Sequence, residues 1–336
     1  MGPFSSIYNM ILSVREFLYR TSLKDSKRLP SKVVSIGNLT LGGTGKTPAV
    51  IALAEEAKKR GFKPCVLTRG YRGKMKTPCM ANKDNVPCLN THLAGDEPVL
   101  MASRLRDIPV VIGRNRYFAG MSAIDDTGKD AINLFILDDG FQHWALHRDL
   151  DILLIDAANP FGNNKLFPEG ILREPLKSMS RADIIVLTKT DAASREQMDA
   201  LILKIKRYNQ YAPLYSSSHM PVSFVNAQGT VRGLDFINKK RVYAFSGIAN
   251  PAYFKTSLTA IGAEVVKFNS FRDHYKYKQQ DIDSIMETAG GLEIITTEKD
   301  LVKLMELNLS EKIFALRIDF FVDEAFYDDI FGRMQC

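Results

Sequence analysis

Near the N-terminus, the apolar run 33–36 is followed by the glycine-rich loop 37–45 and by a helix-like stretch that begins at Lys46-Thr47. This order is typical of a phosphate-binding loop, whose backbone N–H groups and helix N-terminus bind phosphate oxygens. Thr40 replaces the usual first glycine, so we expect Gly42 and Gly43 to supply the backbone freedom. Lys46 should reach the β- and γ-phosphates of a nucleotide, and the Thr47 hydroxyl should bind Mg²⁺. The predicted nucleotide-binding residues are Thr40, Leu41, Gly42, Gly43, Thr44, Gly45, Lys46 and Thr47.

A second apolar run, 132–137, leads directly into Asp138-Asp139-Gly140-Phe141-Gln142-His143. An apolar strand that ends in acids is typical of the Walker B motif, which brings a carboxylate to the nucleotide-bound metal. Two adjacent acids point to opposite sides of an extended chain. One of Asp138 and Asp139 can therefore bind Mg²⁺ while the other orients Lys46 or a water, and the sequence leaves open which. His143 is predicted to touch phosphate or substrate, and a plain turn after a strand is the alternative.

These side chains need a sheet that brings strand ends together. Short apolar runs predict strands at 33–36, 64–68, 109–112, 132–137, 152–155 and 184–187, with helices between several of them. Such alternation predicts an α/β fold of the P-loop NTPase type, with a mostly parallel sheet and helices on both faces.

Two further segments have less regular patterns. The segment 72–90 is predicted to be a long loop or hairpin. The string Thr188-Lys189-Thr190-Asp191 resembles the base-reading N-K-x-D string of GTP-binding proteins without its first Asn, so it is either a plain strand-end loop or a loop near the base.

The composition shifts at 216–221, a Ser-rich stretch that ends in Pro. A second series of short apolar runs follows at 242–245, 264–268, 293–296 and 313–316. We therefore predict a boundary near residue 222. Residues 1–222 would form an N-terminal amphipathic helix and a P-loop kinase domain, and residues 223–336 a smaller α/β domain that closes over the active-site cleft.

The 336-residue chain carries a formal net charge of +7, which favours an anionic partner, with plain solubility as the alternative. No zinc-finger or aromatic-rich pattern indicates nucleic acid. Residues 4–20 repeat apolar side chains at helical spacing, but Arg15 and Glu16 interrupt them, so the segment fits neither a signal peptide nor a spanning helix. It could lie in a membrane surface or pack on its own protein.

Taken together, the motifs resemble those of the tetraacyldisaccharide 4'-kinase family, the lipid A 4'-kinases. The stretches that match, in the order of the family, are 37–48, 68–73, 94–98, 138–143, 172–175, 271–275 and 297–300. They cover almost the whole chain, and the string 138–143 combined with the phosphate-binding loop is the most specific. One departure is Tyr275, where the family often has a second histidine after His274.

The resemblance implies ATP, Mg²⁺ and a tetraacylated glucosamine disaccharide 1-phosphate acceptor, a lipid A precursor. It also implies a P-loop domain joined to a smaller α/β domain. The N-terminal helix would be an amphipathic anchor on the cytoplasmic face of the Gram-negative inner membrane, in a peripheral or monotopic mode. We therefore expect transfer of the γ-phosphate of ATP to the 4'-hydroxyl of the acceptor, with no nucleic acid and no obligate protein partner.

The same resemblance suggests roles for further residues. It pairs Asp96 with His274 for proton removal from the sugar hydroxyl, although Asp273 is an alternative partner and acids at 96–97 could simply cap a helix. Arg173 would be catalytic, and Glu174 would hold Mg²⁺ or orient Arg173. The expected substrate contacts are Asp96, Glu97, His143, Arg69, Arg72 and Arg114, and each arginine could instead be a solvated surface charge. The stretch 297–300 matches the family, but its sequence suggests no physical role.

Other functions remain compatible with parts of the pattern. A nucleotide-dependent switch or targeting ATPase would use the same loop without an acceptor base. A kinase for a small hydrophilic substrate would have no use for the N-terminal helix. A lipid-binding scaffold without enzymatic activity would need neither carboxylate pair. Radiolabelled ATP with a disaccharide 1-phosphate lipid separates these alternatives.

Overall fold

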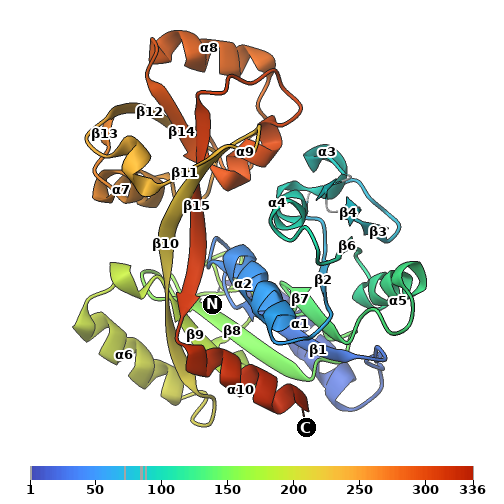
Figure 1. Cartoon of the computed structure of the whole chain (residues 1–336). Helices are drawn as coiled ribbons and strands as arrows, with labels where there is room; N and C mark the ends of the chain where they lie inside the picture. The colour runs from blue at the N-terminus through green and yellow to red at the C-terminus, as the bar shows by residue number, and fades with distance from the viewer. Residues whose placement is uncertain (1, 72, 84–85, 88, 336) are drawn as a thin grey trace.

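A computed structural model describes residues 2–71, 73–83, 86–87 and 89–335 of the chain (Figure 1). Its first unit contains six parallel strands, which lie across the sheet in the order β9, β8, β1, β7, β2 and β6. They are β1 (Lys32–Asn38), β2 (Pro64–Thr68), β6 (Val110–Ile112), β7 (Leu134–Asp138), β8 (Leu150–Asp156) and β9 (Ile184–Thr188). Each predicted strand of this unit is present, and the predicted α/β class with a mostly parallel sheet is confirmed.

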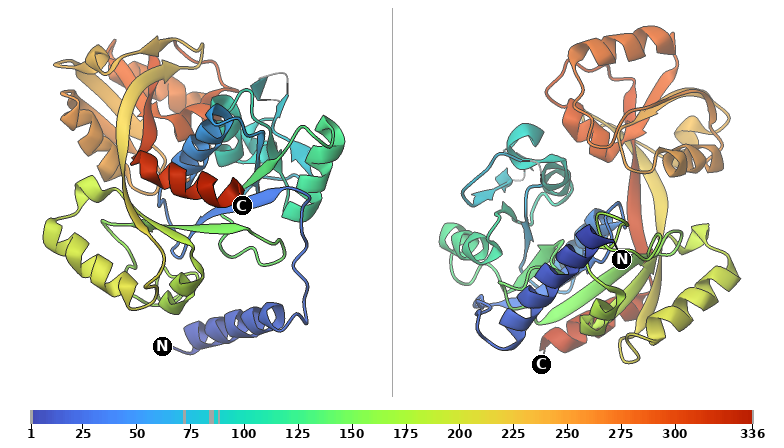
Figure 2. Two further views of the ribbon diagram at one scale, coloured as in Figure 1. Left: turned by 60° about the horizontal axis from the view of Figure 1, so that its bottom comes forward. Right: turned by 180° about the vertical axis from the view of Figure 1, so that it is seen from behind.

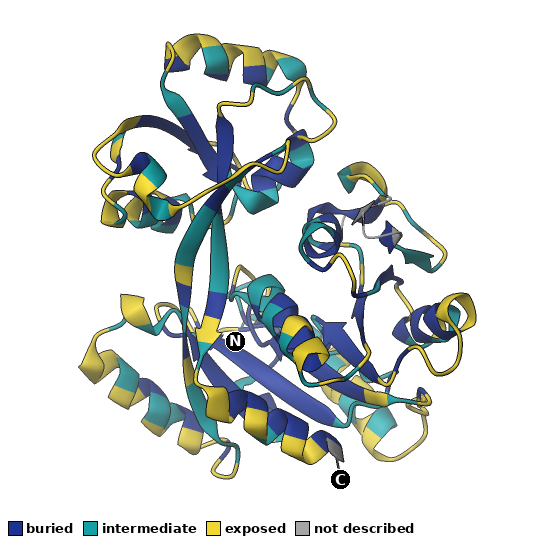
Figure 3. Ribbon diagram, in the orientation of Figure 1, coloured by how far each residue is buried: buried dark blue, intermediate teal, exposed yellow. Residues whose placement is uncertain are grey.

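Helices cover both faces of this sheet, which is why its strands read as uninterrupted apolar runs. Val34 of β1 packs in one cluster with residues of α2 (Lys46–Lys59) and α4 (Asp96–Arg104). The neighbouring Val33 packs in another cluster with residues of α5 (Arg116–Thr127). The strands are accordingly buried along their length in Figure 3. Helix α6 (Arg195–Lys206) follows β9 along the chain.

The second unit repeats the alternation on a smaller scale. Strands β12 (Arg241–Ser246), β13 (Glu264–Ser270), β14 (Glu293–Thr297) and β15 (Ile313–Val322) lie in the order β13, β12, β14, β15. Helices α7 (Pro251–Ala260), α8 (Gln279–Ala289) and α9 (Glu298–Leu304) connect them. The four strands predicted after residue 222 are thus present.

Two long strands join the units. Strand β10 (Leu214–Asn226) pairs with β9 through residues 214–216 and then with β15 through residues 217–226 (Figure 1). The Ser-rich stretch 216–221, whose composition led to the predicted boundary near residue 222, is therefore part of a continuous strand. Small serine side chains do not prevent pairing, because the partner strand satisfies the backbone. The predicted boundary near 222 falls at a register shift between Pro221 and Ser223.

The chain returns to the first unit at its C-terminus. Helix α10 (Glu324–Gln335) packs on α2, and the ring of Phe331 lies 5.1 Å from the ring of Phe62, which follows α2. Figure 1 shows α10 beside the first unit, far from α7 and α8. Residues 324–335 thus differ from the prediction that everything after residue 222 belongs to the smaller domain. Their apolar side chains are part of the cluster that contains α2.

The predicted N-terminal helix is present as α1 (Pro3–Arg20), which lies apart from the sheet (Figure 2). Its inner side is tied to the first unit. The Ser5 hydroxyl donates to the carbonyl of Leu166 at 3.0 Å, and the Tyr8 hydroxyl donates to the carbonyl of Arg173 at 2.9 Å. Its outer side exposes Phe4, Ile7, Met10, Ile11, Val14 and Phe17. Among the described helices, none combines the length and the apolar character that crossing a membrane requires.

The remaining elements are short. Within 72–90, predicted to be a loop or hairpin, β4 (Asn82–Lys83) pairs antiparallel with β5 (Val86–Pro87). The others are β3 (Cys79–Met80), β11 (Val231–Arg232), α3 (Thr91–Ala94) and the 3₁₀ turns η1 (Leu176–Arg181), η2 (Thr190–Ala192) and η3 (Leu234–Ile237).

Candidate active site

The glycine-rich loop connects β1 to α2 at the carboxyl edge of the sheet. It is held by the segment 171–173: the N–H of Leu41 donates to the carbonyl of Ile171, and the N–H of Arg173 donates to the carbonyl of Leu39, both at 2.7 Å. Gly45 precedes α2 with a φ of 83°, a conformation that suits glycine. The first N–H groups of α2 therefore face the loop, as a phosphate-binding helix requires.

Lys46, the first residue of α2, lies over the end of β1. Its Nζ donates to Asn38 Oδ1 at 3.2 Å and lies 3.6 Å from Asp139 Oδ1. Both partners are at the carboxyl ends of adjacent strands. The lysine charge is thus held at the place where the predicted Walker B acids end their strand.

The two adjacent acids have different surroundings. Asp138 is buried, and its carboxylate accepts a hydrogen bond from the Thr68 hydroxyl at 2.8 Å. Burial, followed by the negative charges of Glu97 and Asp139, raises the pKa of Asp138 to about 6. Burial would also raise the pKa of Asp139, but the positive charges of Lys46 and Arg173 outweigh it and lower that pKa below its ordinary value.

The environment of Asp138 fits a divalent cation. Carboxylate and hydroxyl oxygens are the ligands that Mg²⁺ prefers, and Mg²⁺ usually completes its shell with waters and substrate phosphates. A cation would also relieve the negative charge that has accumulated around Asp138. In the part of the chain that the structure describes, no group of three His, Cys, Asp or Glu side chains could hold a metal by itself.

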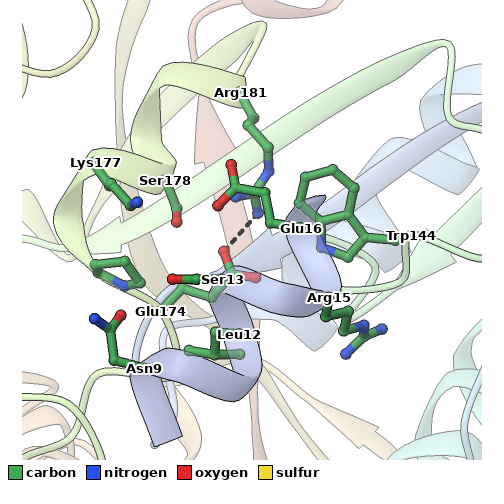
Figure 4. A pocket seen from close by; sticks show the side chains of 11 residues that line it. Asn9, Leu12, Ser13, Arg15, Glu16, Trp144, Glu174, Lys177, Ser178 and Arg181 are labelled. Carbon is green, nitrogen blue, oxygen red and sulfur yellow. Dashed lines mark hydrogen bonds and ion pairs between the residues drawn. The ribbon is translucent and has the colours of Figure 1, made fainter. Parts of the chain in front are cut away.

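Arg173 and Glu174, adjacent in sequence, point to different places. Arg173 Nη1 donates to both carboxylate oxygens of Asp139, at 2.7 and 2.9 Å. Glu174 accepts from Arg181 at 2.6 Å, and Figure 4 shows this pair beside Glu16 and Trp144 under α1. The structure thus brings Arg173 to the site as predicted. It takes Glu174 away from the predicted Mg²⁺ ligands, because its charge is already neutralised in a buried ion pair.

Asp96 and His274 meet across the two units. Asp96 is the first residue of α4, and its Oδ2 lies 2.7 Å from Nδ1 of His274, which is 178 residues away in sequence. Burial alone would raise the pKa of Asp96, but the hydrogen bond from His274 and the charge of Lys299 hold it below its ordinary value. The predicted contact is present. Asp273, the alternative partner, lies 3.6 Å from the other ring nitrogen of His274.

The sequence analysis missed Lys299, which stands beside this pair. Its Nζ lies 3.1 Å from Glu97 Oε1 and 3.9 Å from Asp96 Oδ2. The signal was present in the sequence, because Lys299 belongs to the stretch 297–300 that had no assigned role. Its neighbour Glu298 pairs with Arg104 of α4 and Arg317 of β15. This short stretch therefore ties the second unit to the helix that carries Asp96.

Asp300, the last residue of the same stretch, supports His274 through a glycine. The carboxylate of Asp300 is fully buried and accepts from the N–H of Gly247 at 3.0 Å. The carbonyl of Gly247 in turn accepts from the N–H of His274 at 3.1 Å. His274 adopts a φ of 57°, which is uncommon for a residue other than glycine. The buried carboxylate thus fixes the turn from which the histidine reaches Asp96.

The predicted anion contacts are only partly assembled. Arg69 and Arg114 are exposed near the site, and Arg72 lies outside the described residues. His143 is largely enclosed, and burial together with the charge of Arg116 lowers its pKa to about 3, so it is neutral at physiological pH. A further arginine of this region is Arg116, the first residue of α5. The structure buries it, with Nη2 3.3 Å from the carbonyl of Asp138.

Comparison with known proteins gives one consistent result. The family model of LpxK, tetraacyldisaccharide-1-P 4'-kinase, matches residues 1–335. The tetraacyldisaccharide 4'-kinase of Syntrophus aciditrophicus is 39% identical over 313 residues, which cover 90% of this chain and 83% of the relative. The tetraacyldisaccharide 4'-kinase of Halothermothrix orenii is 36% identical over 318 residues, which cover 90% of this chain and 82% of the relative. The crystal structure of LpxK from Aquifex aeolicus in complex with ATP is similar with a TM-score of 0.80 and 33% identity, covering 99% of this chain and 98% of that one.

Proposed function

The chain belongs to the tetraacyldisaccharide-1-P 4'-kinase family, and we propose how its residues divide the work of phosphoryl transfer. It is an ATP-dependent kinase that transfers the γ-phosphate to the 4'-hydroxyl of a tetraacylated glucosamine disaccharide 1-phosphate, in lipid A biosynthesis. The observation that carries the proposal is the juxtaposition of two sets of residues, Lys46 with Asp138 and Asp139 in one and Asp96 with His274 in the other.

The direct test is incubation of the purified protein with [γ-³²P]ATP and the disaccharide 1-phosphate lipid, followed by separation of the lipid. We expect label on the lipid at the 4' position. Slow release of labelled phosphate without labelled lipid would favour a switch or targeting ATPase. Transfer to water-soluble sugars with equal efficiency would favour a kinase for a small hydrophilic substrate.

In the part of the site that binds the nucleotide, which we call the nucleotide half, the backbone of residues 40–47 holds the phosphates of ATP. Lys46 neutralises negative charge on the phosphoryl group that is transferred. Thr47 and Asp138 would hold Mg²⁺, which when bound neutralises charge on the β- and γ-phosphates. Asp139 acts differently, because its carboxylate lies between Lys46 and Arg173. We assign to it the orientation of these two cations toward the phosphates.

In the part of the site that binds the lipid acceptor, which we call the acceptor half, Asp96 and His274 remove the proton of the 4'-hydroxyl. The lowered pKa keeps the Asp96 carboxylate ionised at neutral pH, so that the pair can accept a proton as the transition state develops. The O–H bond breaks and the new O–P bond forms while the bond between the γ-phosphorus and the β-phosphate oxygen breaks, and ADP leaves. Since this base comes from both units, it is intact only while the two units lie against each other, and an opening of the cleft would separate its two members.

The acceptor brings a phosphate of its own, which needs cations. Arg69 and Arg114 have exposed side chains beside the buried Arg116. The ring of His143 is neutral and can donate a hydrogen bond without adding charge. We assign the 1-phosphate and neighbouring sugar oxygens to these residues, with Glu97 held in place by Lys299.

Replacing Lys299 by Met is expected to move the acidic limb of the kcat–pH profile to higher pH. Lys299 helps to keep the pKa of Asp96 low, and the active form of Asp96 is the carboxylate. With the lysine charge removed, the pKa rises, so activity is lost at a higher pH when the solution is acidified. The measurement is kcat with saturating ATP and lipid from about pH 3 to 9, a range that includes the ordinary pKa of a carboxyl group.

The matched control is Lys267→Met, which removes an exposed lysine of β13 in the same unit. It should leave the profile unchanged. An unchanged acidic limb in Lys299→Met, with wild-type melting temperature, would show that Asp96 does not act as the ionised base.

We propose that the outer side of α1 lies in the cytoplasmic surface of the inner membrane, where ATP is available. The support is its row of exposed apolar side chains, of which Phe4 is 71% and Phe17 59% exposed. An amphipathic helix of this kind inserts one face among lipid headgroups. Not every basic residue of the segment is free to contact lipid phosphate, since Arg20 pairs with Glu16 at 2.9 Å.

The double variant Ile7→Asp/Ile11→Asp is expected to bind vesicles of anionic phospholipid at least about tenfold more weakly, because each buried apolar side chain contributes roughly 1.5–3 kcal/mol. Both positions are exposed, so the fold should not change. Sedimentation with vesicles measures the effect. Leu203→Asp, on the exposed side of α6, is the control and should bind as the wild type does. Equal binding of all three proteins would refute the anchor.

A further inference from the structure

One arginine joins the two units at the end of α4 that is remote from the reacting groups. Arg104 is the last residue of α4, and its guanidinium binds two carboxylates of other elements. Nη1 donates to Glu298 Oε2 of α9 at 3.0 Å, and Nη2 donates to Asp319 Oδ1 of β15 at 2.5 Å. We propose that Arg104 is a positioning residue, which holds α4 against α9 and so keeps Asp96 within reach of His274. The inference rests on the proposed function, in which Asp96 and His274 together form the acceptor base.

The side chain of Arg104 is enclosed between the units. Only 10% of it is exposed, and only 12% of the Glu298 side chain. Burial alone would lower the pKa of Arg104, but the negative charges of Glu298 and Asp319 outweigh it and raise that pKa above its ordinary value. The ion pair is thus shielded from most of the solvent, where it interacts more strongly than an exposed pair. An arginine that merely suited the C-terminal end of its helix could do so while pointing into solvent.

Helix α9 contacts α4 at both ends, and Figure 1 shows the two helices facing each other across the units. Glu298 pairs with Arg104, whereas the next residue, Lys299, donates to Glu97 at the N-terminal end of α4 at 3.1 Å. From Glu97 to Arg104 an α-helix rises by roughly 10 Å. A rigid helix that is held only at its N-terminal end can swing at the other end. The contact at Arg104 therefore fixes the direction of α4 as well as its position.

The same turn of α9 also fixes His274. Two residues after Glu298, the buried carboxylate of Asp300 supports the turn that carries His274, through the backbone of residue 247. The group that binds α4 and the group that sets the histidine thus belong to one helical turn. A displacement of α4 relative to this turn directly changes the distance between Asp96 and His274, which is 2.7 Å. A hydrogen bond of this length tolerates little displacement.

Removing the Arg104 side chain should leave the fold of each unit intact. Its two hydrogen bonds run to α9 and β15, not to the sheet or the phosphate-binding loop of the first unit. Glu298 keeps a hydrogen bond from Arg317 at 3.0 Å, and the Asp319 side chain is 36% exposed. Neither acid is therefore left buried without a partner, which is the costly consequence of breaking a buried pair. The substitution acts on the arrangement of the units.

The first test is Arg104→Met, measured by transfer of label from ATP to the disaccharide 1-phosphate lipid with both substrates varied. We expect kcat to fall by about 10–100-fold, the effect of a small misplacement of catalytic groups. The KM for ATP should change little, because the loop 40–47 lies within the first unit. Arg104→Lys keeps a charge that can reach one carboxylate but lacks the planar fork that binds two. Its kcat should lie between those of Arg104→Met and the wild type.

The matched control is Arg60→Met. Arg60 also binds two carboxylates of another element, those of Glu324 and Asp328 in α10, but it does not join α4 to α9. The kcat of this variant should equal the wild-type value. A fall in kcat that is specific to Arg104 would therefore not be a general effect of losing a bridging arginine.

The second test decides whether Arg104 acts through the pair. In an Asp96→Asn background the pair is already disabled, so adding Arg104→Met should lower kcat further by less than about twofold. Hydrogen exchange followed by mass spectrometry gives a readout that is independent of activity. Exchange in residues 94–104 and 271–277 should be faster in Arg104→Met than in the wild type, and exchange in residues 46–59 should be unchanged.

The outcomes separate this inference from the proposed function. A wild-type kcat in Arg104→Met, or a loss that multiplies with that of Asp96→Asn, would overturn the inference and leave the kinase assignment intact. A wild-type kcat in Asp96→Asn alone would refute the proposed base and the inference with it. If Arg104→Met does not fold, Glu298→Gln gives the same test from the other side of the pair, because it removes the charge and keeps the size of the side chain.

Discussion

Replacing Asp96 by Asn, or His274 by Ala, is expected to lower kcat by about 10²–10⁴-fold, which is the usual contribution of a positioned acid or base. The two side chains are 2.7 Å apart and come from different units, so neither can act on the 4'-hydroxyl in the same way alone. The KM for ATP should change little, because the phosphates are held by the loop 40–47. The measurement is steady-state transfer of label to the lipid, with both substrates varied.

The double variant decides whether the two residues act as one unit. If they do, the kcat of Asp96→Asn/His274→Ala should fall by about the same factor as the kcat of either single variant, because the effects of residues that act as one unit are not additive. Losses that multiply would show two independent roles, and the pairing would then be dropped while the kinase assignment remained. Asp273→Asn is the control for the alternative partner, since it removes the other carboxylate near His274, and it should retain most of the activity.

Lys46→Ala is expected to lower kcat by on the order of 10²–10³-fold, the effect of removing one donor that stabilises charge in a transition state. The fold should be unaffected. Lys46 is at the start of α2, and its partner Asp139 keeps two hydrogen bonds from Arg173. Transfer of label and a thermal melt monitored by circular dichroism measure the two properties separately.

Lys58→Ala provides the comparison for Lys46, because it removes a lysine at the other end of α2, where the side chain is half exposed and pairs with Asp107. A surface ion pair of this kind contributes little, so activity and melting should match the wild type. Turnover near the wild-type value in Lys46→Ala would contradict the assignment of the phosphate-binding loop.

The parts of the fold that could be predicted are those governed by local pattern. The strands β1, β2, β7 and β9 are buried on both faces, so their apolar runs are continuous and visible in the sequence. The loop before Lys46 directly follows such a strand, and the two acids lie at the end of another, which fixed their place at the carboxyl edge of the sheet. Strand β10 was missed, because its pairing with β15 joins residues about a hundred positions apart and depends on the backbone rather than on apolar side chains.

The same distinction holds for the site: the residues that follow local patterns could be predicted, and those brought together by long-range contacts could not. The nucleotide half lies at the ends of neighbouring strands of one sheet, where short connections carry the needed side chains. The acceptor half was assigned only through resemblance to a family, and no spacing in the sequence indicates that Asp96 and His274 touch. The side chain of Glu174 also could not be placed from sequence, because its partner Arg181 and the helix above it are set by packing.

The sequence by itself thus determined the phosphate-binding loop, the acids at the end of β7 and the positions of most strands along the chain, since each depends on residues close together in the chain. Only the tertiary structure decided which acid meets the cations and which residues support His274. Asp138 and Asp139 are chemically identical, and their pKa values diverge because burial isolates one while Lys46 and Arg173 surround the other. Asp300 and Lys299 gain their places because two units meet there, and electrostatic interactions depend on distance in space rather than on position in the chain.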